Sequence, residues 1–205
     1  MTNVLRGAVW PAVIIMAMGL MLTTAFVALQ PRIEQQRQHR AEKIYFDVMS
    51  LPSNEAIELR AAAVIDDKNL ATELAAPTSV YLARRSDGAI VGLVLSVVAD
   101  GYNGGIDLLV GLGSNGTITH VRVISHRESK NIGDAIDIAR SQWIENFSGK
   151  SINNIERIKL KSDGGDIDQI TGATVTSRAV AKTVRAALIY FSEHREELLQ
   201  APTHE

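Results

Sequence analysis

The chain has 205 residues, with 21 basic and 23 acidic side chains and a formal net charge of -2. This length suits one domain of ordinary size plus a further segment, and the balanced charge gives no electrostatic footprint for nucleic acid. Cysteine is absent, which excludes disulfides, thiolate metal sites and iron–sulfur clusters, so any redox chemistry requires an added organic cofactor. The five histidines show no ligand spacing, and we predict no metal site.

Residues 7–29 are uncharged and mostly apolar. As an α-helix they would extend about 34 Å, enough to cross the roughly 30 Å hydrocarbon core of a bilayer. A cleaved signal peptide is the alternative, but its apolar core is shorter and no clear small-x-small cleavage site follows. We therefore predict a single N-terminal transmembrane helix that is retained as an anchor, preceded by a cytoplasmic N-terminus, residues 1–6.

Residues 30–78 are predicted to form a helical stalk and linker. The charged segment 34–49 is helix-prone and continues the anchor until Pro52 ends it. The segment from Asn54 to Ala76 is expected to form one or two short helices.

Residues 79–200 are predicted to form the main domain, with a frayed tail at 201–205. Four β-rich runs are separated by short turns containing Gly, Asp or Asn, which indicates an antiparallel meander. These runs are Val80 to Arg84, Ala89 to Val98, Ile106 to Val110, and Thr117 to Ile124. The second run is continuously apolar, so we expect a central strand covered on both faces.

Helical patterns follow the strands. A stripe of Ile136, Ala139, Trp143 and Phe147 predicts a helix from Asp134 to Phe147, with Trp143 in the core. A short strand is expected around Ile158 to Leu160, and then a long helix to about Leu199. The core stripe of that helix is Val180, Val184, Leu188 and Phe191. The predicted fold class is α+β, with a twisted antiparallel sheet packed by helices.

The segment Asp168 to Ser177 connects a Gly/Asp loop to the long helix and reads Asp-Gln-Ile-Thr-Gly-Ala-Thr-Val-Thr-Ser. Exposed backbone N–H groups and the positive end of the helix dipole occur at such a point, which favours phosphate binding. Small residues there keep side chains out of the way of a phosphate. The alternative is an ordinary helix N-cap provided by Thr174, Thr176 or Ser177.

The pattern Asp-x-x-Thr-Gly-Ala-Thr resembles the signal at which a flavin transferase attaches FMN through its phosphate. That signal occurs in the FMN-binding domains of the Rnf (or Rsx) complex G subunit and of the C subunit of the sodium-pumping NADH:quinone reductase. The resemblance implies that Thr174 carries covalent FMN as a phosphoryl threonine and that Thr176 and Ser177 cap the helix. The other cofactor-binding residues that it implies in this motif are Asp168, Thr171, Gly172 and Ala173. The resemblance covers nearly the whole chain, and the Rnf protein is the closer match of the two.

Two further loops resemble the same family. Residues 101–105 match its Gly-Tyr-x-Gly segment, and Tyr102 either contacts the flavin ring or belongs to a simple hairpin turn. His126 and Glu128 match the family's His-x-Glu-Thr-Pro-Gly-Leu-Gly loop, which implies that they lie at the cofactor. The Thr-Pro-Gly-Leu part is replaced here, although Asn131 can adopt the left-handed conformation that glycine would have had.

The resemblance implies an electron-carrying subunit with covalently bound FMN in a cell inner-membrane complex. That complex couples electron transfer between ferredoxin and NAD to sodium or proton translocation, so the chain is part of a translocase and is not catalytic alone. The implied partners are the other membrane subunits and the flavin transferase, with no nucleic acid. The alternatives are a membrane-tethered scaffold and a redox-sensing module.

The charges that flank the anchor conflict with the resemblance about orientation. Arg6 lies before the anchor and four basic residues lie between positions 32 and 43. A positive-inside count would therefore place the main domain in the cytoplasm. The resemblance places it in the periplasm, where the transferase works, and we adopt that orientation.

Overall fold

The computed structural model describes residues 16, 18, 47–49, 57–65 and 78–200. The chain divides into two compact units, Met1–Lys43 and Ile44–Glu205. Apart from Met16 and Met18, the predicted anchor lies outside the described residues, as does the tail after residue 200. Within the described part of the chain, no helix has the length and apolar character that a membrane span needs.

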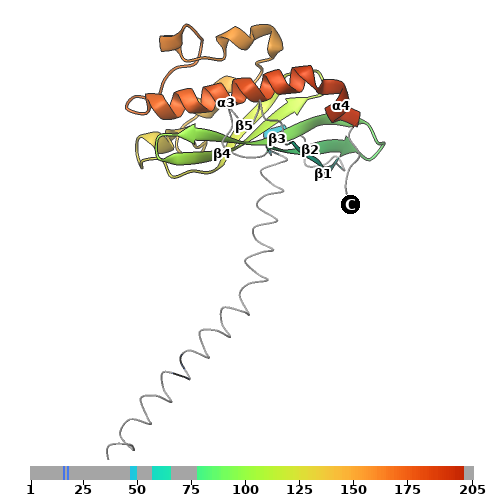
Figure 1. Ribbon diagram of the computed structural model, residues 1–205, viewed down its shortest axis with the longest axis horizontal. Helices are drawn as coiled ribbons and strands as arrows, with labels where there is room; N and C mark the ends of the chain where they lie inside the picture. The colour runs from blue at the N-terminus through green and yellow to red at the C-terminus, as the bar shows by residue number, and fades with distance from the viewer. Residues whose placement is uncertain (1–15, 17, 19–46, 50–56, 66–77, 201–205) are drawn as a thin grey trace, which may run out of the picture. The chain divides into compact units, whose positions relative to one another are not determined.

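Five antiparallel strands form one sheet in the order β1-β2-β3-β4-β5, so each strand pairs with its neighbours along the chain (Figure 1). The strands are β1 (Ile57–Ile65), β2 (Thr78–Arg85), β3 (Ile90–Gly101), β4 (Gly104–Gly113) and β5 (Ile118–Ser125). The predicted antiparallel meander is therefore confirmed for the four runs after residue 78.

Strand β1 shows that the prediction of short helices between Asn54 and Ala76 is wrong for residues 57–65. Helix-forming residues such as Leu59, Arg60 and Ala61 favoured the helix. In the structure the segment pairs antiparallel with β2, with a bulge between Ala61 and Ala63. A neighbouring strand outweighs intrinsic propensity here, and the predicted stalk and linker contains a strand of the main sheet.

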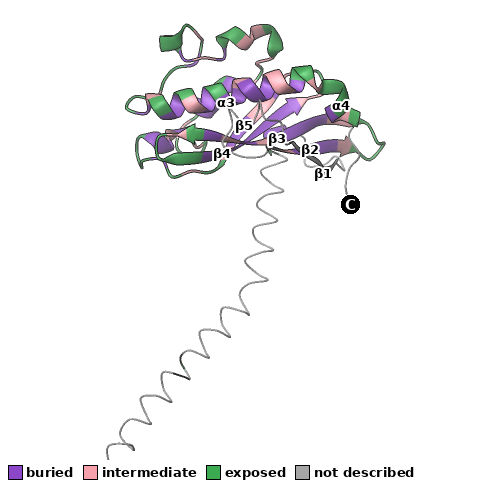
Figure 2. Ribbon diagram, in the orientation of Figure 1, coloured by how far each residue is buried: buried purple, intermediate pink, exposed green. Residues whose placement is uncertain are grey.

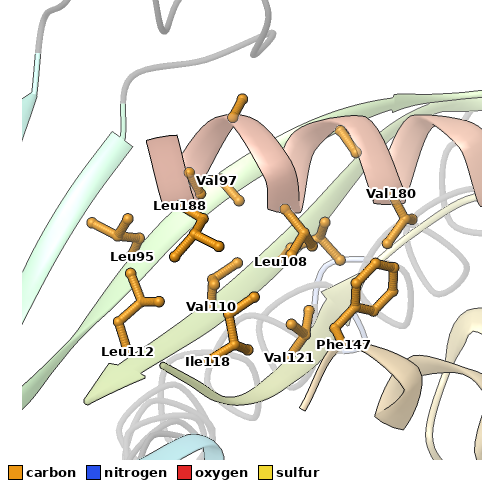
Figure 3. Close-up of a cluster of buried hydrophobic side chains, with 14 of the residues drawn as sticks. Leu95, Val97, Leu108, Val110, Leu112, Ile118, Val121, Phe147, Val180 and Leu188 are labelled. Atoms are coloured by element: carbon orange, nitrogen blue, oxygen red, sulfur yellow. The ribbon is translucent and has the colours of Figure 1, made fainter. Parts of the chain in front are cut away.

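Helix α3 (Thr174–Glu193) lies across one face of the sheet, mainly against β3 (Figure 1). The predicted stripe of Val180, Val184, Leu188 and Phe191 is buried, and the opposite side of the helix is exposed (Figure 2). Val180 and Leu188 point into a cluster that includes Leu95 and Leu108 (Figure 3). Each fully buried aliphatic side chain contributes about 1.5–3 kcal/mol, so this packing fixes the position of the helix.

The long C-terminal helix is interrupted. Helix α3 ends at Glu193, and α4 (Arg195–Gln200) begins after His194, whose φ of -112° and ψ of 18° are not helical. The single helix predicted to reach Leu199 is therefore two helices.

The predicted helix from Asp134 to Phe147 is also not continuous. Two 3-10 helices, η1 (Gly133–Ile136) and η2 (Trp143–Phe147), are separated by Asp137 in an extended conformation. Trp143 is buried as predicted, although Ala139 of the same stripe is exposed. The apolar pattern identified most of the core residues but not the local helix type.

Short elements connect η2 to α3. They are the 3-10 helices η3 (Ile152–Arg157) and η4 (Lys161–Asp163). The strand expected around Ile158 to Leu160 is reduced to one parallel bridge between Leu160 and Ile167.

Residues Asp47–Met49 cover the face of the sheet opposite α3. Val48 and Met49 pack with Val94 and Leu109 in a second apolar cluster, while Leu93 and Leu95 belong to the cluster under α3. Strand β3 is therefore covered on both faces, as predicted.

The backbone of this segment approaches β4 and β5 closely. The Thr119 hydroxyl donates to the Val48 carbonyl at 2.5 Å. Gly111 makes the approach possible, because a Cβ there would lie 2.5 Å from the same carbonyl oxygen.

Arg122 holds the segment Asp47–Met49 through an ion pair with Asp47. Its guanidinium, in a side chain that is 9% exposed, contacts Asp47 at 2.5 Å and Glu145 at 2.7 Å. Burial raises the pKa of Glu145, but hydrogen bonds from Ser148 and His120 and the charge of Arg122 together hold that pKa below its usual value. The ionised carboxylate links β5 to η2 through Arg122.

We predict that Gly111→Ala lowers the free energy of unfolding by about 1–3 kcal/mol, because the added methyl group has no space beside Val48. The measurement is urea denaturation. Gly105→Ala is the matched control in the same strand, because its Cβ would meet only the Val98 side chain at 3.2 Å.

A double-mutant cycle with Thr119→Val tests the cause. Thr119→Val alone should cost about 1 kcal/mol, but almost nothing once Gly111→Ala has displaced the Val48 carbonyl. Additive costs would contradict displacement of this segment.

Candidate functional site

A pocket of about 430 Å³ lies where the first turn of α3 meets the β3–β4 turn and the loop after β5. Its lining residues are Tyr102, Glu128, Ser129, Ile132, Gly133, Gly172, Ala173, Thr174, Val175 and Thr176. Its volume is in the range of small-molecule and cofactor sites in proteins.

The start of α3 presents unpaired backbone donors to this pocket. Gly172 has a φ of 81°, a left-handed conformation that favours glycine, and the N-cap residue Ala173 makes no side-chain capping bond. Among the described residues, the N–H groups of Thr174, Val175 and Thr176 have no hydrogen-bond partner. The positive end of the helix is therefore free to bind an anionic group.

The hydroxyl groups at the start of α3 differ in whether they are hydrogen-bonded. Thr176 donates to Glu128 Oε2 at 2.5 Å, and Ser177 accepts from the Ile170 N–H and donates to the Ala173 carbonyl. Neither hydroxyl accepts from a first-turn N–H group, so the prediction that they cap the helix is wrong. The Thr174 hydroxyl has no partner in the described part of the chain and lines the pocket.

The outer walls of the pocket are apolar and open. Tyr102, Ile132 and Val175 are 71%, 46% and 51% exposed, high values for large apolar side chains. Ile132 follows Asn131, which has a φ of 65° and so adopts the predicted left-handed conformation. These side chains suit contact with a flat, apolar ring system.

The structure places five of the eight predicted cofactor-binding residues at the pocket: Tyr102, Glu128, Gly172, Ala173 and Thr174. Tyr102 belongs to the hairpin turn and also lines the pocket, so the two interpretations of this residue are compatible.

The other three predicted residues do not line it. Thr171 is exposed, and His126 accepts through Nδ1 from the Glu128 N–H at 3.1 Å. Asp168 pairs with Lys161 at 2.8 Å, while its carbonyl accepts from Trp143 Nε1 at 2.5 Å.

Five lining residues were not predicted as cofactor contacts: Ser129, Ile132, Gly133, Val175 and Thr176. Ser129, Val175 and Thr176 lie within two positions of a predicted residue, whereas Ile132 and Gly133 follow Glu128 by four and five positions. The resembling motifs around them were the signal that the sequence offered.

Ion pairs hold the loop before α3 to the helix. Arg178 contacts Asp163 with two hydrogen bonds, at 2.7 and 2.9 Å. Those bonds lower the pKa of Asp163 and raise the pKa of Arg178. Both residues are on the surface, so the pair contributes more to the path of the loop than to stability.

Comparison with known proteins identifies the family of the chain. The FMN-binding domain family matches residues 101–189, a range that contains every lining residue of the pocket. The G subunit of the ion-translocating oxidoreductase complex of Vibrio vulnificus (strain YJ016) is 34% identical over 186 residues, which are 90% of this chain and 87% of the relative. The chain belongs to this G-subunit family.

The corresponding G subunit of Aliivibrio fischeri (strain ATCC 700601 / ES114) is 31% identical over 98% of this chain and 97% of its own. The crystal structure of Shewanella oneidensis NqrC superposes with a TM-score of 0.59 at 15% identity, covering 80% of this chain and 98% of that chain. At this identity the NqrC likeness shows a shared fold. The predicted α+β fold with an antiparallel sheet and packed helices is thus confirmed for the described domain.

The residues present fit FMN. Three N–H groups and a hydroxyl that have no partner among the described residues suit its phosphate, and the apolar rim suits its ring. The lining holds one carboxylate, Glu128, whose oxygens already accept from Asn103 and Thr176.

We predict that Trp143→Phe lowers the free energy of unfolding by at least about 1 kcal/mol, because the Asp168 carbonyl loses its buried donor. Denaturant titration measures the loss. Ser192→Ala is the control: its exposed hydroxyl bonds only to its own helix, and its removal should change stability by less than about 0.5 kcal/mol. Equal stabilities of the two variants would show that the Trp143 bond does not hold the loop.

Proposed function

We propose that this chain is a membrane-anchored electron carrier with FMN bound covalently through a phosphodiester to Thr174. The observation that carries the proposal is the state of the Thr174 hydroxyl. It lines the pocket, it begins α3, and it is free of hydrogen bonds within the described residues.

Competing hydroxyls are less suited to accept the flavin phosphate. Thr176 and Ser177 are 1% and 0% exposed and are already hydrogen-bonded. Thr171 is exposed but lies outside the pocket lining. The fold thus favours Thr174 over the other three hydroxyls of the motif.

The chain's own groups bind and orient the cofactor. The N–H groups of Thr174, Val175 and Thr176 would stabilise the phosphate by hydrogen bonds and by the helix dipole. Tyr102, Ile132 and Val175 would contact the ring and exclude water from its faces. When bound, FMN supplies transfer of one or two electrons, and the protein supplies attachment and position.

We further propose that the carrier works within an ion-translocating oxidoreductase complex, as the names of its relatives indicate. On this proposal the complex exchanges electrons between ferredoxin and NAD and moves sodium or protons. Its other membrane subunits are the partners, and a flavin transferase that recognises Asp168 and the following motif attaches the cofactor. The absence of cysteine is consistent with the proposal, because this sequence offers no thiolate ligand for an iron–sulfur cluster.

We predict that Thr174→Ala abolishes covalent flavin, because it removes the acceptor oxygen. The measurement is in-gel flavin fluorescence of the full chain, co-expressed with the transferase and run under denaturing conditions. Ser192→Ala is the control and should keep its fluorescence, because its exposed hydroxyl lies on the same helix but outside the motif. Fluorescence of equal strength in Thr174→Ala would place the acceptor elsewhere, and a dark wild-type chain would favour a scaffold without flavin.

We predict that residues from about position 30 onward lie in the periplasm, anchored by residues 7–29. Protease added to cells with a permeabilised outer membrane should digest this domain. Protection that persists until the inner membrane is broken would show that the positive-inside count gives the correct orientation.

A further inference from the structure

Glu128 is a buried carboxylate that joins three separate parts of the pocket. It is 7% exposed and lies in the loop between β5 and η1. Its Oε1 accepts from the backbone N–H of Asn103, at the tip of the β3–β4 turn, at 2.9 Å. Its Oε2 accepts from the Thr176 hydroxyl, in the first turn of α3, at 2.5 Å. One side chain therefore links the loop, the hairpin and the helix.

The surroundings leave this carboxylate little freedom. A Cβ on Gly101 would lie 2.6 Å from Oε1, and a Cβ on Gly133 would lie 2.9 Å from the Glu128 Cβ. A second bond, from Asn103 Nδ2 to the Ser129 hydroxyl at 3.1 Å, joins the same hairpin and loop. The two glycines thus allow the close approach that both Glu128 hydrogen bonds require.

The carboxylate is not part of a salt bridge. Within the described residues, no lysine, arginine or histidine pairs with Glu128. Burying a carboxylate without a cation is unfavourable, and two hydrogen bonds compensate only part of that cost. An apolar side chain of similar size would fill the same space at lower cost, so stability alone does not account for this residue.

We propose that Glu128 is a positioning residue that sets the spacing between the two walls of the pocket. One wall carries Tyr102, the neighbour of Asn103, and the other carries Thr174, two residues before Thr176. Because each carboxylate oxygen holds one wall, Glu128 fixes the space in which the ring of an attached flavin is held. The inference rests on the proposed attachment at Thr174 and assigns Glu128 a role other than direct cofactor binding.

The test compares Glu128→Ala, Glu128→Gln and Thr176→Val in the full chain, flavinylated by the transferase. Alanine removes both links and valine removes only the link to α3. Glutamine keeps both links. Its side-chain carbonyl accepts from the Asn103 N–H, and its amide donates to the Thr176 hydroxyl oxygen. The Thr176 hydroxyl then donates its own proton to the backbone carbonyl four residues earlier. Asp134→Ala is the control, because Asp134 is 6% exposed in η1, directly after that loop, but pairs with Arg140 and does not line the pocket.

Three measurements distinguish a positioning role of Glu128 from an effect on the stability of the fold and from an effect on flavin attachment. In-gel fluorescence reports attachment, circular dichroism in the visible flavin bands reports a fixed ring, and hydrogen exchange of the Asn103 amide reports the hairpin link. All are made well below the unfolding temperature of each variant. Absence of attachment in the wild-type chain would refute the proposed function, whereas the other two measurements address Glu128.

We expect Glu128→Ala to keep covalent flavin but to lose most of the visible dichroism. Its Asn103 amide should exchange at least about tenfold faster, the factor for losing one hydrogen bond to a charged group. Glu128→Gln and Asp134→Ala should match the wild type in both measurements, and Thr176→Val should lose dichroism while Asn103 stays protected. Wild-type dichroism in Glu128→Ala would overturn the proposal. Equal losses in the glutamine and alanine variants would overturn it too, because charge rather than hydrogen bonding would then be responsible.

Discussion

The packing of α3 against β3 is the contact on which the pocket depends. It buries Val180, Val184, Leu188 and Phe191 and so fixes the axis of the helix and the place where its first turn begins. The hairpin that carries Tyr102 is the continuation of the same β3 strand. Both walls of the pocket are therefore the ends of two elements that share one core, and the site is built on rigid secondary structure with only the 126–133 loop between them.

The helix start is stabilised by distant groups instead of by local caps. Trp143 Nε1 donates to the carbonyl of Asp168, and the hydroxyl of Thr176 donates to Glu128. Because the N-cap residue is Ala173, which has no side-chain oxygen, the donors of the first turn have no partner within the described residues. A helix end in this state is less stable by itself, and the cost is recovered when an anion binds. On the proposed attachment, binding the flavin phosphate would therefore also stabilise the fold at this position.

The parts that sequence could predict are those specified by neighbouring residues. Strands β2 to β5 were predicted because Gly, Asp and Asn turns separate them. Gly172 and Thr174 were singled out because they belong to one contiguous motif. Strand β1 was not identified, because its conformation is imposed by pairing with β2 and its own residues favour a helix. The contact between Thr176 and Glu128 was missed for a similar reason: the two residues are 48 positions apart, and no local pattern indicates it. The stripe from Ile136 to Phe147 was assigned to the core, but its period does not distinguish an α-helix from two short 3-10 helices.

The first turns of α3 also limit how this part of the chain can change in length. Successive residues on an α-helix are rotated by about 100°, so one residue inserted between Thr174 and Val180 would turn the Thr174 hydroxyl away from the pocket while the core stripe stayed in place. A single deletion would turn it the opposite way. Neither change needs to unfold the domain, yet each would leave the proposed acceptor oxygen of Thr174 facing away from the pocket. On the proposed attachment, insertions and deletions in this interval would therefore give a folded protein that carries no covalent flavin.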